Sequence, residues 1–174
     1  MSVIYYAQNT CCIGTGYAAN EECASQLKSA LEWAGDEVFV ANTSGPVDIW
    51  GFPAGGTTHL NMVLGSVDVG LMTVFPSFLD YRTIAFLRSQ HIRFVEIPPE
   101  EFPAYAGNYV LVEPGKVIIS ATAKQTIKKL RAEGVTCIEI DPGPYDKAGM
   151  AAWDCQTGKW HRDKGPTKDD LFHQ

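Results

Sequence analysis

The sequence lacks the features of several common protein classes. Its 14 lysines and arginines are outnumbered by 20 acidic residues, giving a formal net charge of −6, and they are scattered apart from four on one expected helix. Nucleic-acid binding requires clustered basic side chains. No apolar run approaches the ~18 residues of a membrane span, and the amino terminus has no signal-peptide pattern. We therefore expect neither nucleic acid nor membrane as a partner.

The cysteines are odd in number and lack the spacing of a known motif. The five cysteines form neither a C-x-x-C pair nor a zinc pattern with the four histidines, and the glycines lack the G-x-G-x-x-G spacing of a dinucleotide site. Adjacent Cys11 and Cys12 would point to opposite faces of a strand, which favours core residues over a redox pair. We expect reduced thiols in a cytoplasmic protein with no metal and no cofactor.

The sequence does contain an internal repeat. Three segments each read as a helix end, a short turn and a strand, and each follows a hairpin pattern and an apolar stripe at helical spacing. The chain therefore predicts three β-β-α-β units, with sheets inside and helices outside. The first helix is expected to be capped by Asn20 and to end before Gly35. The third is expected to begin with a capping box of Thr122 and Gln125.

The second unit carries local expectations of its own. Its hairpin is predicted to have strands over 59–64 and 67–75, with the Gly-Ser pair between them as the turn. Ser77 and Asp80 resemble a capping box at the start of the helix. His91 takes the position of the terminating glycine, where a positive charge would suit the helix dipole.

Three further segments complete the domain prediction. Residues 42–58 form a connection rich in Gly, Pro and Thr that is longer than the ~4–6 residues typical of ordered loops. Residues 149–155 read as the opening of a fourth unit, and the polar residues 159–174 read as a surface tail. We predict a single domain over 1–158 followed by that tail.

Four segments carry a family resemblance: Gly14–Glu22, Thr58–Leu64, Gly107–Val112 and Asp154–Thr157. They resemble motifs of the guanidine-modifying pentein superfamily, which includes arginine deiminase and dimethylarginine dimethylaminohydrolase. In chain order they are similar to that family's glycine-R-T-N, H-L-D-T-V, G-N-x-L-x-L and H-C-M-T segments. The resemblance covers about residues 3–158 and implies an α/β fold: a partial pentein-like propeller of three β-β-α-β units plus a fragment of a further unit.

The chain departs from these motifs at several positions. The family's Arg-Thr pair is replaced by Ala18-Ala19 or its neighbours, the aspartate two residues after the histidine is Asn61, and the histidine before the cysteine is Asp154. The family's acidic E-G-G-D segment would precede Val3, where this sequence begins, so we expect an incomplete ring of units. Exposed strand edges would then favour a homodimer.

The resemblance also implies covalent chemistry on a guanidine or amidine substrate. A thiolate attacks the amidine carbon, a histidine protonates the leaving amine and then activates water, and carboxylates hold the guanidinium. The resemblance assigns Cys155 as nucleophile and His59 as acid/base. It implies substrate contacts at Asn61, Asp154 and Asn108.

Plainer interpretations of these residues stay open. Cys155 also suits a half-buried strand position in a surface hairpin, and His59 a strand start that is hydrogen-bonded to a glycine loop. Asn61 cannot neutralise a guanidinium, so another carboxylate would have to substitute for it. Candidate substitutes are Asp68, Asp154 and Glu96. The second function hypothesis is therefore a non-catalytic binding or assembly protein on the same scaffold.

Overall fold

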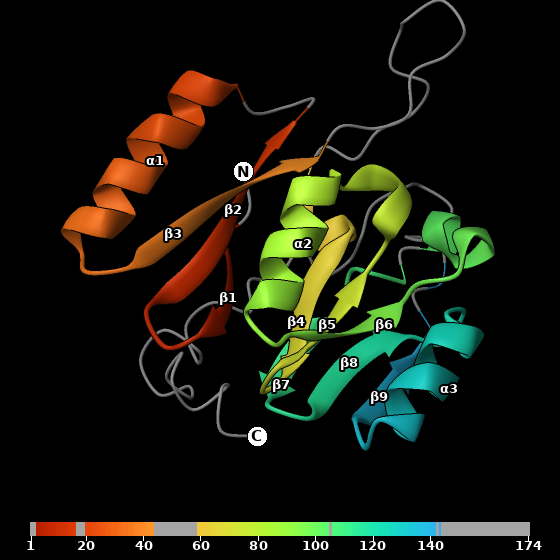
Figure 1. Cartoon of the computed structure of the whole chain (residues 1–174). Helices are drawn as coiled ribbons and strands as arrows, with labels where there is room; N and C mark the ends of the chain where they lie inside the picture. Colours follow the sequence, from red (N-terminus) through yellow and green to blue (C-terminus); the bar gives the residue numbers. More distant parts are fainter. Residues whose placement is uncertain (1–2, 17–19, 44–58, 105, 142, 144–174) are drawn as a thin grey trace, which may run out of the picture.

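The computed structural model of the 174-residue chain shows one unit repeated three times (Figure 1). In each unit an antiparallel hairpin is followed by a helix and by a strand that pairs in parallel with the second hairpin strand. The predicted β-β-α-β units are thus confirmed, but the three sheets are separate, so a closed propeller is not shown. The structure describes residues 3–16, 20–43, 59–104, 106–141 and 143.

The first unit follows the sequence prediction closely. Its elements are β1 (Val3–Ala7), β2 (Thr10–Gly16), α1 (Glu21–Trp33) and β3 (Glu37–Thr43). The side chain of Asn20 accepts a hydrogen bond from the backbone N–H of Cys23 at 2.8 Å, which caps α1 as expected. Gly35 ends the helix with φ +93°, a conformation that costs glycine little.

The hairpin predicted for the second unit is wrong in its register. The elements are the 3-10 turn η1 (Leu60–Met62), β4 (Leu64–Asp68), β5 (Leu71–Val74), the 3-10 turn η2 (Pro76–Phe78), α2 (Tyr81–Ser89) and β6 (Arg93–Glu96). The turn lies at Gly70, whose φ of +61° a side chain would oppose. Gly65 lies inside β4 instead, because the Tyr109 hydroxyl occupies the space that a Cβ there would need.

The start of α2 is also corrected, whereas its end is confirmed. Asp80 is itself the N-cap and accepts the backbone N–H of Thr83 at 2.8 Å, so Ser77 forms no capping box with it. His91 does take the glycine position at the helix end, with φ +59°.

The third unit begins after the 3-10 segment η3 (Pro99–Ala104). Its elements are β7 (Val110–Glu113), β8 (Lys116–Ser120), α3 (Lys124–Ala132) and β9 (Thr136–Ile140). The capping box predicted from Thr122 and Gln125 is wrong. Instead the carboxylate of Glu101 accepts the backbone N–H groups of Gln125 and Thr126 at 2.6 and 2.8 Å. This cap lies more than twenty residues upstream, beyond the reach of a local motif.

The three units pack side by side with their first strands innermost. β4 lies against β1 on one side and against β7 and β8 on the other, while α2 packs on β3 and α3 on β6. The helices thus lie outside the sheets (Figure 1). Cys12 belongs to the large core shared by the units, and Cys11 to a small core beneath α1. This confirms the core interpretation of the cysteine pair.

Several predictions fall on residues outside the described part of the chain. They concern the long connection beyond residue 43, the fourth-unit fragment, the tail at 159–174, and the residues Asp154 and Cys155. Among the described residues, none of the helices combines the length and the apolar character needed to cross a membrane.

Candidate functional site

Two predicted site residues, His59 and Asn61, lie on one turn at the entrance to β4. His59 immediately precedes η1, has an extended backbone (φ −134°, ψ 135°) and is half-buried. Its backbone carbonyl accepts the N–H of Met62 at 3.2 Å. Leu60 anchors the turn because it is only 1% exposed. A Cβ at Gly14 of β2 would lie 2.7 Å from the Leu60 Cβ, so glycine lets the turn pack directly on the first unit.

A pair of asparagines joins this turn to the third unit. Nδ2 of Asn61 donates to Oδ1 of Asn108 at 3.3 Å, and the two residues are 8% and 2% exposed. Gly107 permits this approach, since a Cβ there would overlap the backbone carbonyl of Met62. The structure therefore brings together two of the motifs that the sequence places 47 residues apart.

The next residue, Tyr109, holds the third unit against the second. Its hydroxyl lies 2.9 Å from Oγ1 of Thr73, which also donates to the carbonyl of Gly65. Burial raises the pKa of the Tyr109 phenol above its usual range. The hydroxyl therefore stays protonated at neutral pH and serves as a fixed positioning group beside the asparagine pair.

The asparagine pair contains one unsatisfied donor. Nδ2 of Asn108 is buried and has no hydrogen-bond partner among the described residues. A buried amide donor without an acceptor costs about 1–3 kcal/mol, and such groups in native proteins call for an explanation such as a bound molecule. The buried Asn108 amide therefore marks a point of the site whose hydrogen bonding the described residues do not complete.

Of the candidate carboxylates, Asp68 lies away from this turn, whereas Glu96 is in register with Val74 and Leu64, at the same end of the sheet as the turn. Asp68 is at the opposite end of β4, about 13 Å along the strand from Leu64, and its Oδ1 accepts the N–H of Val69 at 2.7 Å. Glu96 is exposed on β6. The described residues contain no cluster of three or more His, Cys, Asp or Glu side chains that could hold a metal. The pairing of His59 with Cys155 stays a prediction.

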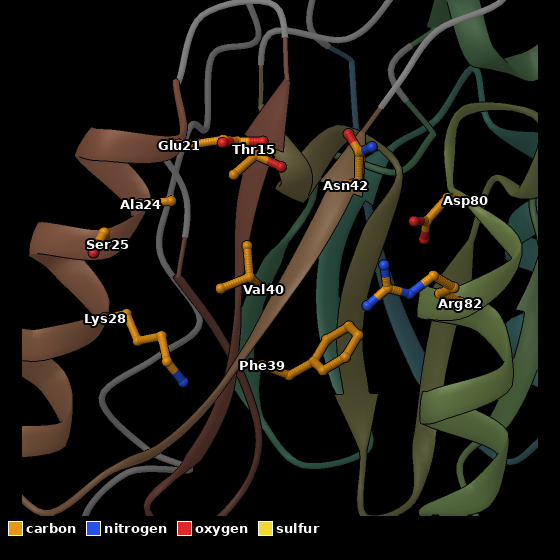
Figure 2. A pocket seen from close by; sticks show the side chains of 10 residues that line it. All are labelled: Thr15, Glu21, Ala24, Ser25, Lys28, Phe39, Val40, Asn42, Asp80 and Arg82. Atoms are coloured by element: carbon orange, nitrogen blue, oxygen red, sulfur yellow. The ribbon is translucent and has the colours of Figure 1, made fainter.

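A groove of about 380 Å³ lies elsewhere, between α1 and α2 (Figure 2). Phe39 forms part of its floor, Lys28 reaches from α1 to the carbonyl of Val38 at 3.0 Å, and Arg82 extends from α2 toward β3. Sequence patterns do not predict this groove because its lining comes from two units. The groove includes none of the predicted site residues.

Comparison with known sequences gives one informative relative. No protein-family model matches the chain. The 2-nitroimidazole nitrohydrolase of Mycobacterium sp. (strain JS330) is 31% identical over 119 residues. The match covers 67% of this chain and 31% of the relative, so the chain spans about a third of that protein's length.

Solved structures match more of the chain. DDAH from Pseudomonas aeruginosa, complexed with citrulline, has a TM-score of 0.62 at 23% identity and covers 85% of this chain. The N-terminal domain of a cyanobacterial arginine dihydrolase scores 0.68 at 17% identity over 87% of this chain. An amidinotransferase of saxitoxin biosynthesis from Microseira wollei scores 0.66 at 16% identity over 86%. The matches cover 50%, 52% and 43% of those chains, respectively.

Proposed function

We propose that this chain, which has the fold of the pentein superfamily, displaces a group from an amidine-type carbon. Such a carbon is trigonal and bonded to at least two nitrogens. The guanidine carbon of arginine and the nitro-bearing carbon of 2-nitroimidazole both meet this description, and both substrates stand in the names of similar proteins. The observation that carries the proposal is the turn of His59 and Asn61, packed against Asn108 where the three units meet.

In the first half-reaction the thiolate of Cys155 adds to the amidine-type carbon. A carbon–sulfur bond forms, and the π electrons move onto a neighbouring nitrogen. Collapse of this adduct expels the leaving group with its bonding electron pair. An amine must be protonated as it leaves, which is the role that we assign to protonated His59.

In the second half-reaction water replaces the cysteine. Neutral His59 takes a proton from water, and the hydroxide adds to the carbon that carries the sulfur. The carbon–sulfur bond then breaks, the thiolate re-forms, and the added hydroxyl releases its proton to become the carbonyl oxygen of the product. One water is consumed for each group displaced, and the scheme draws on no metal or cofactor.

Turnover by matched histidine variants tests this function. Nitrite release from 2-nitroimidazole and ammonia release from arginine are measured for the whole chain, for His59→Ala and for His91→Asn. We expect His59→Ala to lower kcat/KM about 10²–10⁴-fold. The control variant, His91→Asn, should leave kcat/KM unchanged, because His91 is exposed and asparagine tolerates its φ of +59°. Equal turnover by both variants would contradict the role of His59.

The assay also separates the two functional classes. If the wild-type chain binds 2-nitroimidazole or arginine but releases neither product, the chain is a non-catalytic binding protein on the same scaffold. If the Cys155→Ser chain still turns over substrate, the covalent step on Cys155 is excluded, but the assignment of the site to the His59 turn stands.

We also propose a cytoplasmic homodimer. The four described cysteines, of which three are buried, are free thiols, as a reducing compartment would keep them. Two exposed apolar side chains support self-association. These are Trp33 on α1, 90% exposed, and Ile138 on β9, 40% exposed.

A further inference from the structure

We propose that the groove between α1 and α2 binds a short zwitterionic peptide, which adds to the edge of β3 as one further strand. This inference goes beyond the displacement chemistry, because none of the residues assigned to that chemistry lines the groove. The groove holds about 380 Å³ between the two helices and β3 (Figure 2). That volume is at the lower end of the roughly 300–1,000 Å³ typical of small-ligand sites, so it suits a short ligand.

The edge of β3 faces this groove, because β3 is the outer strand of its sheet. Successive residues of a strand direct their backbone N–H and C=O groups to opposite sides, so every second residue of β3 points both groups away from β2. Two hydrogen bonds identify these residues. The carbonyl of Val38 accepts Nζ of Lys28 at 3.0 Å, and the carbonyl of Asn42 accepts the N–H of Asp80 at 3.3 Å. Val40 lies between them, so its N–H and C=O also point outward.

The outward backbone groups of Val40 are available to a ligand. They have no partner among the described residues, and Val40 lines the groove and is 37% exposed. An edge strand with unpaired backbone groups is a template for the addition of an extended peptide. In an antiparallel pair, two residues opposite each other can exchange both of their hydrogen bonds. A single residue of a peptide would therefore satisfy both groups of Val40.

Arg82 is the cation that can meet a carboxylate of the ligand. The other cation of the groove, Lys28, is committed, since its Nζ also lies 2.7 Å from Oε1 of Glu32. Arg82 is exposed and forms no ion pair within the described part of the chain. Its guanidinium extends from α2 toward β3 (Figure 2). A guanidinium offers planar N–H donors that suit a carboxylate, so we place the carboxyl end of the peptide at Arg82.

The carboxylates of the groove determine the direction of the peptide. Glu21 and Thr15 both lie at its upper end in Figure 2, and Thr15 is in register with Asn42 near the end of β3. Asp80 lies at the same end, because its N–H bonds the carbonyl of Asn42. These two carboxylates would attract an ammonium group, whereas Arg82 lies farther down the groove. The peptide therefore runs antiparallel to β3, with its amino terminus near Asn42.

An NMR titration of the whole isotope-labelled chain with trialanine, both of whose termini are free, tests the inference. We expect saturable binding with a dissociation constant of about 1 mM or tighter. The amide proton of Val40 should shift downfield because it gains a hydrogen bond. The absence of a saturable shift at the groove would overturn the inference. So would shifts of the groove residues that depend on protein concentration alone, because a second copy would then be the occupant.

Two altered ligands separate the strand edge from the charges without changing the protein. Trialanine with an amidated carboxyl end lacks the partner of Arg82. A depsipeptide, in which an ester oxygen replaces the N–H of the central residue, lacks the donor to the carbonyl of Val40. We expect the first to bind about tenfold more weakly than trialanine and the second about threefold or more. Equal binding of trialanine and the depsipeptide would refute addition to the edge of β3.

A matched pair of arginine variants on α2 locates the site. Arg82→Ala should weaken the binding of trialanine about tenfold and remove its advantage over the amidated ligand. Arg88→Ala removes the same charge from the same helix, but Arg88 lies over the ring of Phe94 and not in the groove, so binding should be unchanged. Both arginines are exposed, so we expect both variants to fold. Equal weakening by the two variants would show an effect of net charge and overturn the assignment.

Discussion

Gly107 and Gly14 determine how closely the His59 turn can be held. Each is glycine because another residue occupies the space of a Cβ: the backbone of Met62 at Gly107, and the side chain of Leu60 at Gly14. Side chains can move aside, but a backbone carbonyl inside a packed turn moves only with its neighbours. Gly107 is therefore the less replaceable of the two, and it immediately precedes Asn108.

Replacing Gly107 by alanine should destabilise the fold strongly. We expect a loss of about 3 kcal/mol, the upper part of the usual range for overpacking. The comparison is Gly134→Ala, where φ is +87° but nothing lies within 4 Å of the new Cβ, so that only backbone strain of about 1–2 kcal/mol applies. Urea denaturation measures both. A Gly107→Ala chain no less stable than Gly134→Ala would contradict the close packing of the turn.

The elements differ in how far the sequence predicts them. The cap of α1 by Asn20 was predictable because donor and acceptor are three residues apart. The cap of α3 by Glu101 was not, because that carboxylate comes from a different segment. The predicted turn of the second hairpin was wrong for a related reason. Gly65 resembles a turn residue in the sequence, but it is glycine because Tyr109, 44 positions later, packs against it. Contacts between units are invisible to local patterns.

The cap of α3 predicts a difference between two neighbouring glutamates. Glu101 is 7% exposed and accepts two backbone N–H groups and the Thr126 hydroxyl. Glu101→Ala should lower the free energy of unfolding by about 2 kcal/mol or more, because it leaves buried donors unpaired. Glu100→Ala removes an exposed contact with Gln125 and should change stability little. Thermal or urea unfolding measures both, and equal losses would show that the buried cap is unimportant.

The packing of the whole molecule leaves two complementary faces. α2 packs on β3, where Phe86 stacks on Phe39 with ring centroids 3.9 Å apart, and α3 packs on β6, where Lys129 donates to the carbonyl of Glu96 at 2.8 Å. Among the described residues, α1 covers no strand of another unit, and β9 is covered by no helix of another unit. We infer that α1 of one copy packs on β9 of a second copy.

The charges of these faces agree with that arrangement. A groove of about 340 Å³ beside β9 is mainly basic, while α1 is mainly acidic. Attraction between them would orient the copies and weaken as salt rises. The basic residues of the groove that form no ion pair among the described residues are Lys124 and Lys128, since Arg131 pairs with Glu139. On α1 the corresponding acidic residues are Glu21 and Glu22, since Glu32 pairs with Lys28.

Sedimentation tests the assembly. We expect a dimer at micromolar concentration that is weakened by salt and converted to monomer by Trp33→Lys combined with Ile138→Lys, which places like charges on the two faces. Tyr81→Glu removes another exposed aromatic, 84% exposed, outside the two faces and should leave the dimer intact. A wild-type monomer, or a double variant that remains dimeric, would show that these faces do not join two copies.

The most direct test of the central claim is a mass-spectrometric map of the adduct formed with a chloroacetamidine probe. The account predicts a single adduct on Cys155 that forms much more slowly in His59→Ala. The exposed thiol of Cys23 reports non-specific labelling, while burial raises the pKa of Cys12 and keeps that thiol protonated. Equal labelling of the wild-type and Cys155→Ser chains, or an adduct mainly on Cys23, would contradict the assignment of Cys155 as the nucleophile.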